Sequence, residues 1–150
     1  MKALRPLLAL GAAIAAMVAV PAFADTPTSL TIVGHQVLPS PGTFTLSTGS
    51  GSISDYGSFD ESFRHFAALP SPVTGIAQLE LVFTGQAGVL TMQCEDRFGA
   101  PTGSLSVING NCVITAGTGT YAGLQGTAQL VALFDATGTV VDVTLQGQVH

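Results

Sequence analysis

The sequence predicts an all-β protein folded as an antiparallel β-barrel of about eight strands. After residue 24, short segments alternate apolar with polar residues, the pattern of strands that bury only one face. Gly, Pro, Ser and Asn separate these segments at close intervals, and hardly any stretch has helical spacing. The 150 residues include 18 glycines and only 9% charged side chains, which suits barrel walls better than packed helices. Many short strands joined by close turns are typical of an antiparallel barrel or sandwich.

The alternation places the strands along the chain. Residues 76–84 form the clearest one, with Leu79 and Leu81 on one face and Glu80 between them on the solvent side. The predicted strands are 30–33, 43–46, 76–84, 89–94, 104–108, 112–115, 128–134 and 141–149. The side chains expected to line the interior are Leu79, Leu81, Phe83, Leu90, Met92, Val141, Val143 and Leu145.

Two polar stretches are predicted to be turns. Asn109-Gly110 is a dipeptide that favours tight hairpin turns, and it separates two strand-like runs. Residues 95–97 (Glu-Asp-Arg) follow Cys94 and are interpreted as a turn rather than a site.

The first 24 residues have the features of a cleavable signal peptide. Lys2 and Arg5 precede the apolar run 7–20, and Ala-Phe-Ala ends at Ala24, so cleavage would leave Asp25 as the new N-terminus. The alternative is an uncleaved anchor, but the run is shorter than the roughly 20 residues of a spanning helix. We therefore expect one exported domain, residues 25–150, secreted or periplasmic and without a stable membrane span.

The charge of this domain excludes two classes of partner. It has no lysine and keeps only Arg64 and Arg97 against nine carboxylates, a formal charge of −7. Nucleic acids and anionic lipids are bound through cationic side chains that displace counterions. Neither partner is expected.

Cys94 and Cys112 are the only cysteines. An even pair in an exported chain indicates a disulfide, here between two predicted strands. A metal site is the alternative, but no histidine lies near either cysteine in the sequence. We predict a structural disulfide and no metal or cofactor.

Residues 55–75 break the strand pattern. Their aromatic spacing fits a helical turn or an irregular strand, and prolines then favour a long loop, which would lie at the mouth of the barrel. The candidate ligand-binding residues are Tyr56, Arg64, His65 and Phe83. Acidic residues here could also act with His65 as an acid–base or metal group, and the simpler interpretation is a solvated loop; these residues are Asp55, Asp60 and Glu61.

Residues 117–127 (GTGTYAGLQGT) form a glycine-rich run between two apolar segments. It formally fits the G-x-G-x-x-A dinucleotide fingerprint, but that site needs a following helix, which the later glycines oppose. A sharply bent wall strand is the better interpretation. The structural positions are Gly117, Gly119, Tyr121, Gly123 and Gly126.

The same run resembles the G-T-G-x-Y-x-G-L-x-G motif of the allene oxide cyclase-like barrel superfamily, which includes the plant dirigent proteins. Residues 52–59, 83–85 and 88–91 also resemble strand segments of its bacterial secreted members. The resemblance implies an eight-stranded barrel around an apolar cavity, and a homo-oligomer, since the plant relatives are trimers. Plant members cyclise an unsaturated fatty-acid epoxide or direct the coupling of phenoxy radicals. No catalytic residue of theirs can be matched here.

Three functions are consistent with these observations. The first is an exported barrel, non-enzymatic or of unassigned activity, that binds a small apolar molecule or acts through its outer surface. The second is a cyclase or isomerase that positions an apolar substrate. The third is an envelope or matrix component recognised through its outer surface, which a barrel packed solid with side chains would favour.

Overall fold

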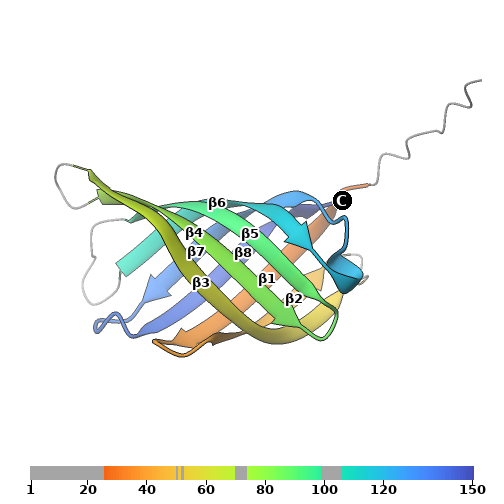
Figure 1. Ribbon diagram of the computed structural model, residues 1–150, viewed down its shortest axis with the longest axis horizontal. Coiled ribbons are helices and arrows are strands. Elements are labelled where there is room, and N and C mark those ends of the chain that lie inside the picture. Colours follow the sequence, from red (N-terminus) through yellow and green to blue (C-terminus); the bar gives the residue numbers. More distant parts are fainter. Residues whose placement is uncertain (1–25, 50, 52, 70–73, 99–105) are drawn as a thin grey trace, which may run out of the picture.

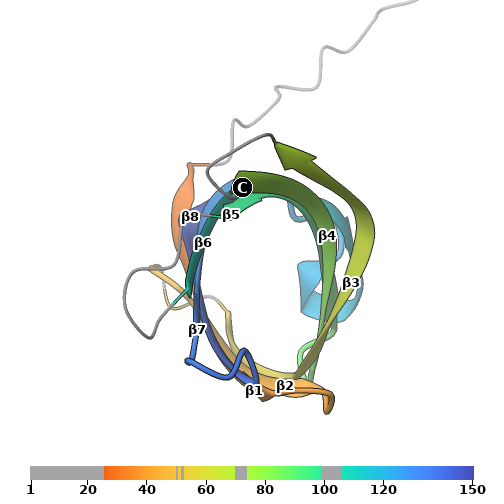
Figure 2. The same ribbon diagram turned by 90° about the vertical axis from the view of Figure 1, so that its left-hand side faces the viewer.

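The computed structural model describes residues 26–49, 51, 53–69, 74–98 and 106–150, with side chains described for all of these except 63–69, 74, 98 and 106. Eight strands form one closed antiparallel barrel in which each strand pairs with the next and β8 pairs with β1 (Figures 1 and 2). The predicted fold class is confirmed. The strands are β1 (Thr28–Val37), β2 (Gly42–Thr48), β3 (Ser54–Leu69), β4 (Thr74–Gly85), β5 (Val89–Phe98), β6 (Ser106–Gly117), β7 (Gly126–Phe134) and β8 (Val140–Val149).

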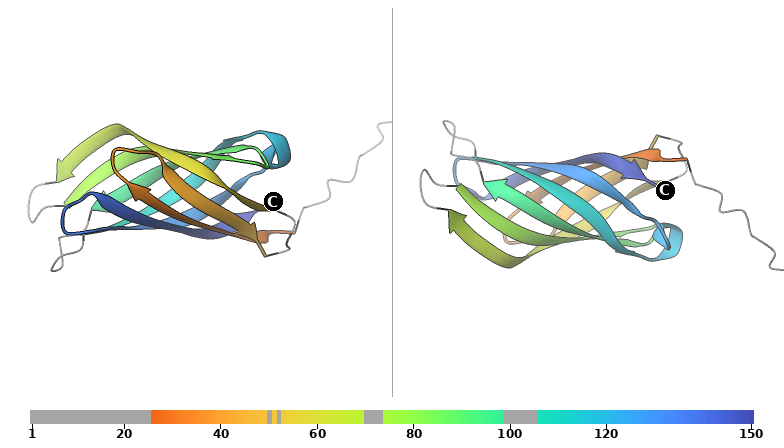
Figure 3. Two further views of the ribbon diagram at one scale, coloured as in Figure 1. Left: turned by 90° about the horizontal axis from the view of Figure 1, so that it is seen from below. Right: turned by 90° about the horizontal axis from the view of Figure 1, so that it is seen from above.

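The up-and-down order gives the barrel two ends. The odd-numbered strands all end where β1 turns into β2, which we call the β1–β2 end. The β4–β5 turn, the 3₁₀ turn η1 (Gly119–Tyr121) and the C-terminus lie at the opposite end, the β4–β5 end (Figure 3). Figure 2 looks along the barrel from the β1–β2 end.

Apolar side chains from alternate strand positions fill the middle of the barrel. Phe83 packs against Phe44 and Phe59, with ring centroids 5.1 and 5.6 Å away. Phe59 lies over Gly34 and Gly42, where any β-carbon would overlap its ring. All eight predicted interior side chains are buried: Leu79, Leu81, Phe83, Leu90, Met92, Val141, Val143 and Leu145.

Of the two alternatives for the aromatic part of residues 55–75, the irregular strand is confirmed and the helical turn is wrong; the proline stretch 70–73 lies outside the described residues. β3 continues for 16 residues to Leu69 and pairs with β4 along its length. The register shifts once, between Phe63 and His65. A bulge of this kind bends a strand and moves later side chains by one position, so simple alternation fails to detect the strand.

Both predicted turns near the cysteines were also wrong. Residues 95–97 continue β5, and Asn109-Gly110 lies within β6, where Gly110 pairs with Asp96 on one side and Leu130 on the other. Gly110 is needed for space rather than for turning. A β-carbon at this position would overlap Oδ1 of Asp96.

The glycine-rich run is a connection, not a bent wall strand. β6 ends at Gly117, η1 follows, and β7 begins at Gly126. Gly119 and Gly123 have φ of +60° and +78°, a left-handed conformation that breaks the strand and favours glycine. Tyr121 is fully buried in the core beneath this connection.

The predicted disulfide is present. Cys94 and Cys112 face each other in the β5–β6 pair with an S–S distance of 1.97 Å. Such a bond is compatible with an oxidising extracellular or periplasmic compartment. The predicted signal peptide, residues 1–24, lies outside the described residues. Within the described part of the chain, no helix is long and apolar enough to cross a membrane.

Removing this disulfide should destabilise the barrel. The bond joins residues 18 apart in the sequence, and closing a loop of that size restricts the unfolded chain by about 3 kcal/mol. We expect Cys94→Ser with Cys112→Ser to lower the melting temperature by several degrees without changing the far-ultraviolet circular dichroism spectrum. Unchanged thermal stability would show that the bond contributes nothing.

Candidate functional site

Asp96 is a fully buried carboxylate that faces the interior of the barrel. It lies on the same face of β5 as the core side chains of Leu90, Met92 and Cys94, and its exposed fraction is 0%. Its strand neighbours are the small residues Ala77 and Gly110. Among the residues that the structure describes, neither carboxylate oxygen has a hydrogen-bond partner. An unpaired buried carboxylate is costly, so this position requires a functional explanation.

Glu61 is the second interior carboxylate. It follows Phe59 on the inward face of β3 and is half-buried. Burial raises the pKa of Glu61 above its usual value. Burial, together with the nearby charge of Glu61, raises the pKa of Asp96 to about 7. Two neighbouring carboxyl groups in an apolar interior resist ionising together.

Gln36 adds a third interior polar side chain, and only 4% of its surface is exposed. It lies next to the last residue of β1, across the eight-stranded barrel from β5. Its Nε2 donates to the carbonyl oxygen of Ser40 at 2.9 Å, while its Oε1 has no partner in the described part of the chain. Three polar side chains thus point inward from odd-numbered strands, and we call them the interior acceptor group: Gln36, Glu61 and Asp96. Gln36 and Asp96 lie within two residues of the ends of their strands, and Glu61 lies in the middle of β3.

This arrangement can bind or transfer protons. In the interior acceptor group, Gln36 and Asp96 lie within two residues of the ends of β1 and β5, and they offer oxygens that have no partner among the described residues. A carboxyl group with a pKa about 7 can also serve as a general acid or base near neutral pH. Among the described residues, no group of three or more His, Cys, Asp or Glu side chains could hold a metal.

A second buried carboxylate, Asp55, has a structural role at the β4–β5 end. Its oxygens accept from the Tyr121 hydroxyl at 2.7 Å and from the backbone N–H groups of Tyr56, Gln86 and Ala87 at 2.8–2.9 Å. Burial alone would raise the pKa of Asp55, but these hydrogen bonds outweigh it and hold the pKa below its usual value. All four acceptor contacts are used, so Asp55 joins β3 to two connections and has no free capacity for a ligand.

The structure does not bring the sequence-predicted ligand residues together. Tyr56 points outward, 59% exposed, and its hydroxyl accepts from Gln86 Nε2 at 2.7 Å. Phe83 is fully buried in the aromatic core. Arg64 and His65 lie in β3 at the register shift, and their side chains are outside the described ones. Asp60 is exposed on the outer face.

Sequence reasoning missed Asp96 and Gln36 as site residues. The signal for Asp96 was present, because Leu90, Met92, Cys94 and Asp96 continue one period-two face. Gln36 similarly follows Leu30, Ile32 and Gly34 on the inward face of β1.

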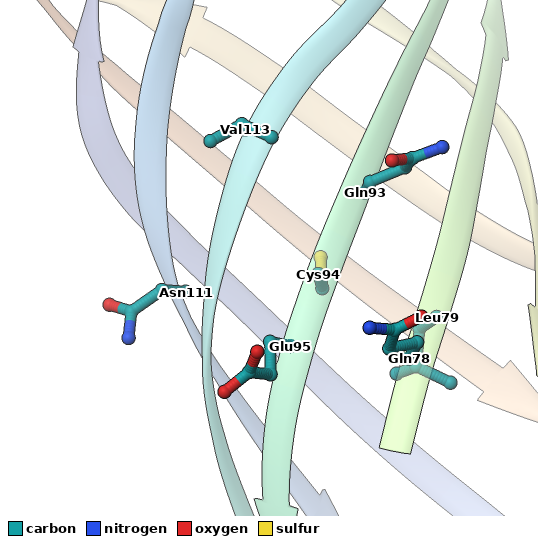
Figure 4. Close-up of a pocket in the computed structure, with 7 residues that line it drawn as sticks. All are labelled: Gln78, Leu79, Gln93, Cys94, Glu95, Asn111 and Val113. Carbon is teal, nitrogen blue, oxygen red and sulfur yellow. The ribbon is translucent and has the colours of Figure 1, made fainter. Parts of the chain in front are cut away.

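The outer wall carries shallow grooves between polar side chains. Figure 4 shows one across β4, β5 and β6, in which Gln78, Gln93 and Asn111 extend from the wall. Gln78, Glu95 and Asn111 lie in register, and Gln129 and Gln146 continue the row on β7 and β8. The amides of this row and the carboxylate of Glu95 keep the β surface solvated. All of these side chains are exposed, in contrast to the buried carboxylate of Asp96.

Comparison of the chain with models of known protein families, with curated proteins and with solved structures gives no match.

Proposed function

We propose that the protein is an exported binding barrel, without catalytic activity, that holds a small and largely apolar molecule at the β1–β2 end of its interior. The observation that carries this proposal is the unpaired carboxylate of Asp96 within an apolar wall. Ligand sites are characteristically apolar cavities in which a few polar groups fix the orientation of the ligand. An eight-stranded barrel is wide enough for one small ligand.

The surroundings of Asp96 support an interior site. Ala77 and Ala132 are buried residues with small side chains, and Gly110 has none. These small residues contrast with the bulky cluster of Phe44, Phe59 and Phe83 in the core, and Gly110 leaves the space that the carboxylate of Asp96 occupies. The disulfide and the predicted signal peptide support export, and the resemblance to the allene oxide cyclase-like superfamily supports a ligand inside the barrel.

A larger side chain in the interior at the β1–β2 end should weaken the binding of an apolar ligand. The neutral fluorescent probe N-phenyl-1-naphthylamine is expected to bind the purified protein saturably. Ala77→Leu, which places extra carbon atoms beside Asp96, should weaken the affinity at least tenfold. Val82→Leu, on the outer face of the same strand, should leave it unchanged. Circular dichroism and thermal melts establish that each variant is folded, and Ala132→Leu replaces Ala77→Leu if the latter is not.

Equal affinity in all folded variants, or no saturable binding, would contradict an interior site. The third function, recognition through the outer wall, would then be the better account.

A cyclase or isomerase is the second candidate, and one observation favours it. The pKa of Asp96, about 7, is suited to moving a proton at neutral pH. Turnover of an unsaturated fatty-acid epoxide by the protein, lost in Asp96→Asn, would favour this function over simple binding.

A further inference from the structure

We infer that the ligand is an amphipathic amine, whose cationic amino group is bound between Asp96 and Gln36 on opposite walls of the barrel. This inference rests on the proposed function, because it names the chemical class of the molecule bound there. It follows from the hydrogen-bonding capacity, the charge and the surroundings of the interior acceptor group.

The unpaired atoms are all acceptors. Both oxygens of Asp96 and Oε1 of Gln36 have no partner among the described side chains and backbone, and the amide nitrogen of Gln36 already donates to Ser40. Once Asp96 is ionised, its carboxylate, like the amide oxygen of Gln36, can only accept hydrogen bonds. The complementary ligand must therefore donate several hydrogen bonds, as an ammonium group does.

The charge of the site favours a cation over a neutral donor. Glu61 and Asp96 are close enough for the charge of one to disfavour the charge of the other. The basic side chains that the structure describes, His35, Arg97 and His150, are all exposed. A bound cation would relieve this repulsion and would form charge-assisted hydrogen bonds, which are about twice as strong as neutral ones.

The side chains around the interior acceptor group indicate that the remainder of the ligand is apolar. Ala77 and Val141 are fully buried, and Ala132 is nearly so. Val141 pairs with Gln36, and Ala77 pairs with Asp96. These walls match the polarity of a hydrocarbon chain, whereas a polyamine would place further charges against them.

Three ten-carbon ligands test this inference through displacement of N-phenyl-1-naphthylamine. Decylamine, decanol and decanoate share one chain and differ in charge and hydrogen-bonding capacity. Decylamine is expected to bind at least tenfold more tightly than decanol, and decanoate more weakly than either. Asp96→Asn should remove the preference for the amine, so that decylamine and decanol displace the probe with similar affinities. Asp60→Asn removes an outward carboxylate on β3 and should change neither the affinity for decylamine nor the affinity for decanol.

The binding should also be linked to protons. At pH 6 Asp96 is mostly protonated, so decylammonium binding should release close to one proton, measured from calorimetric enthalpies in buffers of different ionisation enthalpy. The groups that face Asp96 from β4 and β6, Ala77 and Gly110, do not titrate, and Glu61 is the described charge nearby. Affinity should rise about tenfold between pH 6 and pH 8, where a primary amine stays charged.

The outcomes separate the two proposals. If decanol and decylamine displace the probe equally, the inference about the amine is wrong and the proposed function stands. If the probe itself does not bind, the proposed function fails. If decylamine gains its preference only in Arg64→Met, the guanidinium of Arg64 occupies the carboxylates in the native protein, and the inference is overturned.

Discussion

Asp55→Ala is expected to destabilise the barrel by about 3–5 kcal/mol. The substitution removes the acceptor of four hydrogen bonds, from the Tyr121 hydroxyl and from the backbone N–H groups of Tyr56, Gln86 and Ala87. Each buried donor left without a partner costs roughly 1–3 kcal/mol, and groups that reach water recover part of that cost. Chemical denaturation followed by circular dichroism measures the change.

Two variants act as controls for Asp55. Tyr121→Phe removes one of the four hydrogen bonds and should cost about 1–2 kcal/mol. Asp135→Ala removes an aspartate that also accepts from backbone N–H groups, those of Thr139 and Val140, but in an exposed turn. Its effect on the melting temperature should be much smaller. Similar losses for Asp55→Ala and Asp135→Ala would show that burial of the Asp55 network contributes little.

Asp96 is expected to make the protein less stable at pH 8 than at pH 5. Its pKa is about 7 in the folded protein against an ordinary value of 3.8, so the folded state holds a proton that the unfolded state releases. The free energy of unfolding therefore falls as pH rises from about 4 to 7 and is level above that range. About three pKa units correspond to a loss of up to about 4 kcal/mol. Denaturant titrations between pH 4 and 9 measure this slope.

Asp96→Asn should remove most of that slope and make the protein more stable than the wild type at pH 8. Glu61→Gln should move the midpoint of the slope to lower pH, because the charge of Glu61 helps to raise the pKa of Asp96. Asp60→Asn, on the outer face, is the matched control and should leave the slope unchanged. A wild-type protein whose stability rises between pH 5 and 8 would contradict the buried, protonated state of Asp96.

Asp55 and Asp96 should affect the pH dependence of the free energy of unfolding in opposite directions. The pKa of Asp55 is lowered in the folded protein, so its contribution is complete above the ordinary pKa of an aspartate and is lost as pH falls through the lower, folded value. Stability should therefore be highest near the low-pH end of the pH range in which Asp96 is protonated and Asp55 is ionised. Asp55→Asn should reduce the loss of stability at acidic pH.

The sequence by itself determined the fold class, the interior side chains and the disulfide. Leu79, Leu81 and Phe83 alternate with polar residues within one strand, and the burial of one face of a sheet imposes this period locally. Cys94 and Cys112 were the only pair available, and each lay in a strand-like segment. These features depend on near neighbours in the chain or on composition, so the sequence was sufficient to predict them.

Only the tertiary structure decided which polar residues lie inside. Glu95, Asp96 and Arg97 have the composition of a turn, and Asn109-Gly110 is a strong hairpin signal. Both stretches remain in strands because β5 pairs with β4 and β6 across them, and Gly110 leaves the space that the carboxylate of Asp96 fills. The register shift between Phe63 and His65 likewise interrupts the alternation, so the pattern of residues did not reveal the full length of β3. Strand length and the face a residue occupies depend on pairing with distant segments, and a local pattern cannot contain that information.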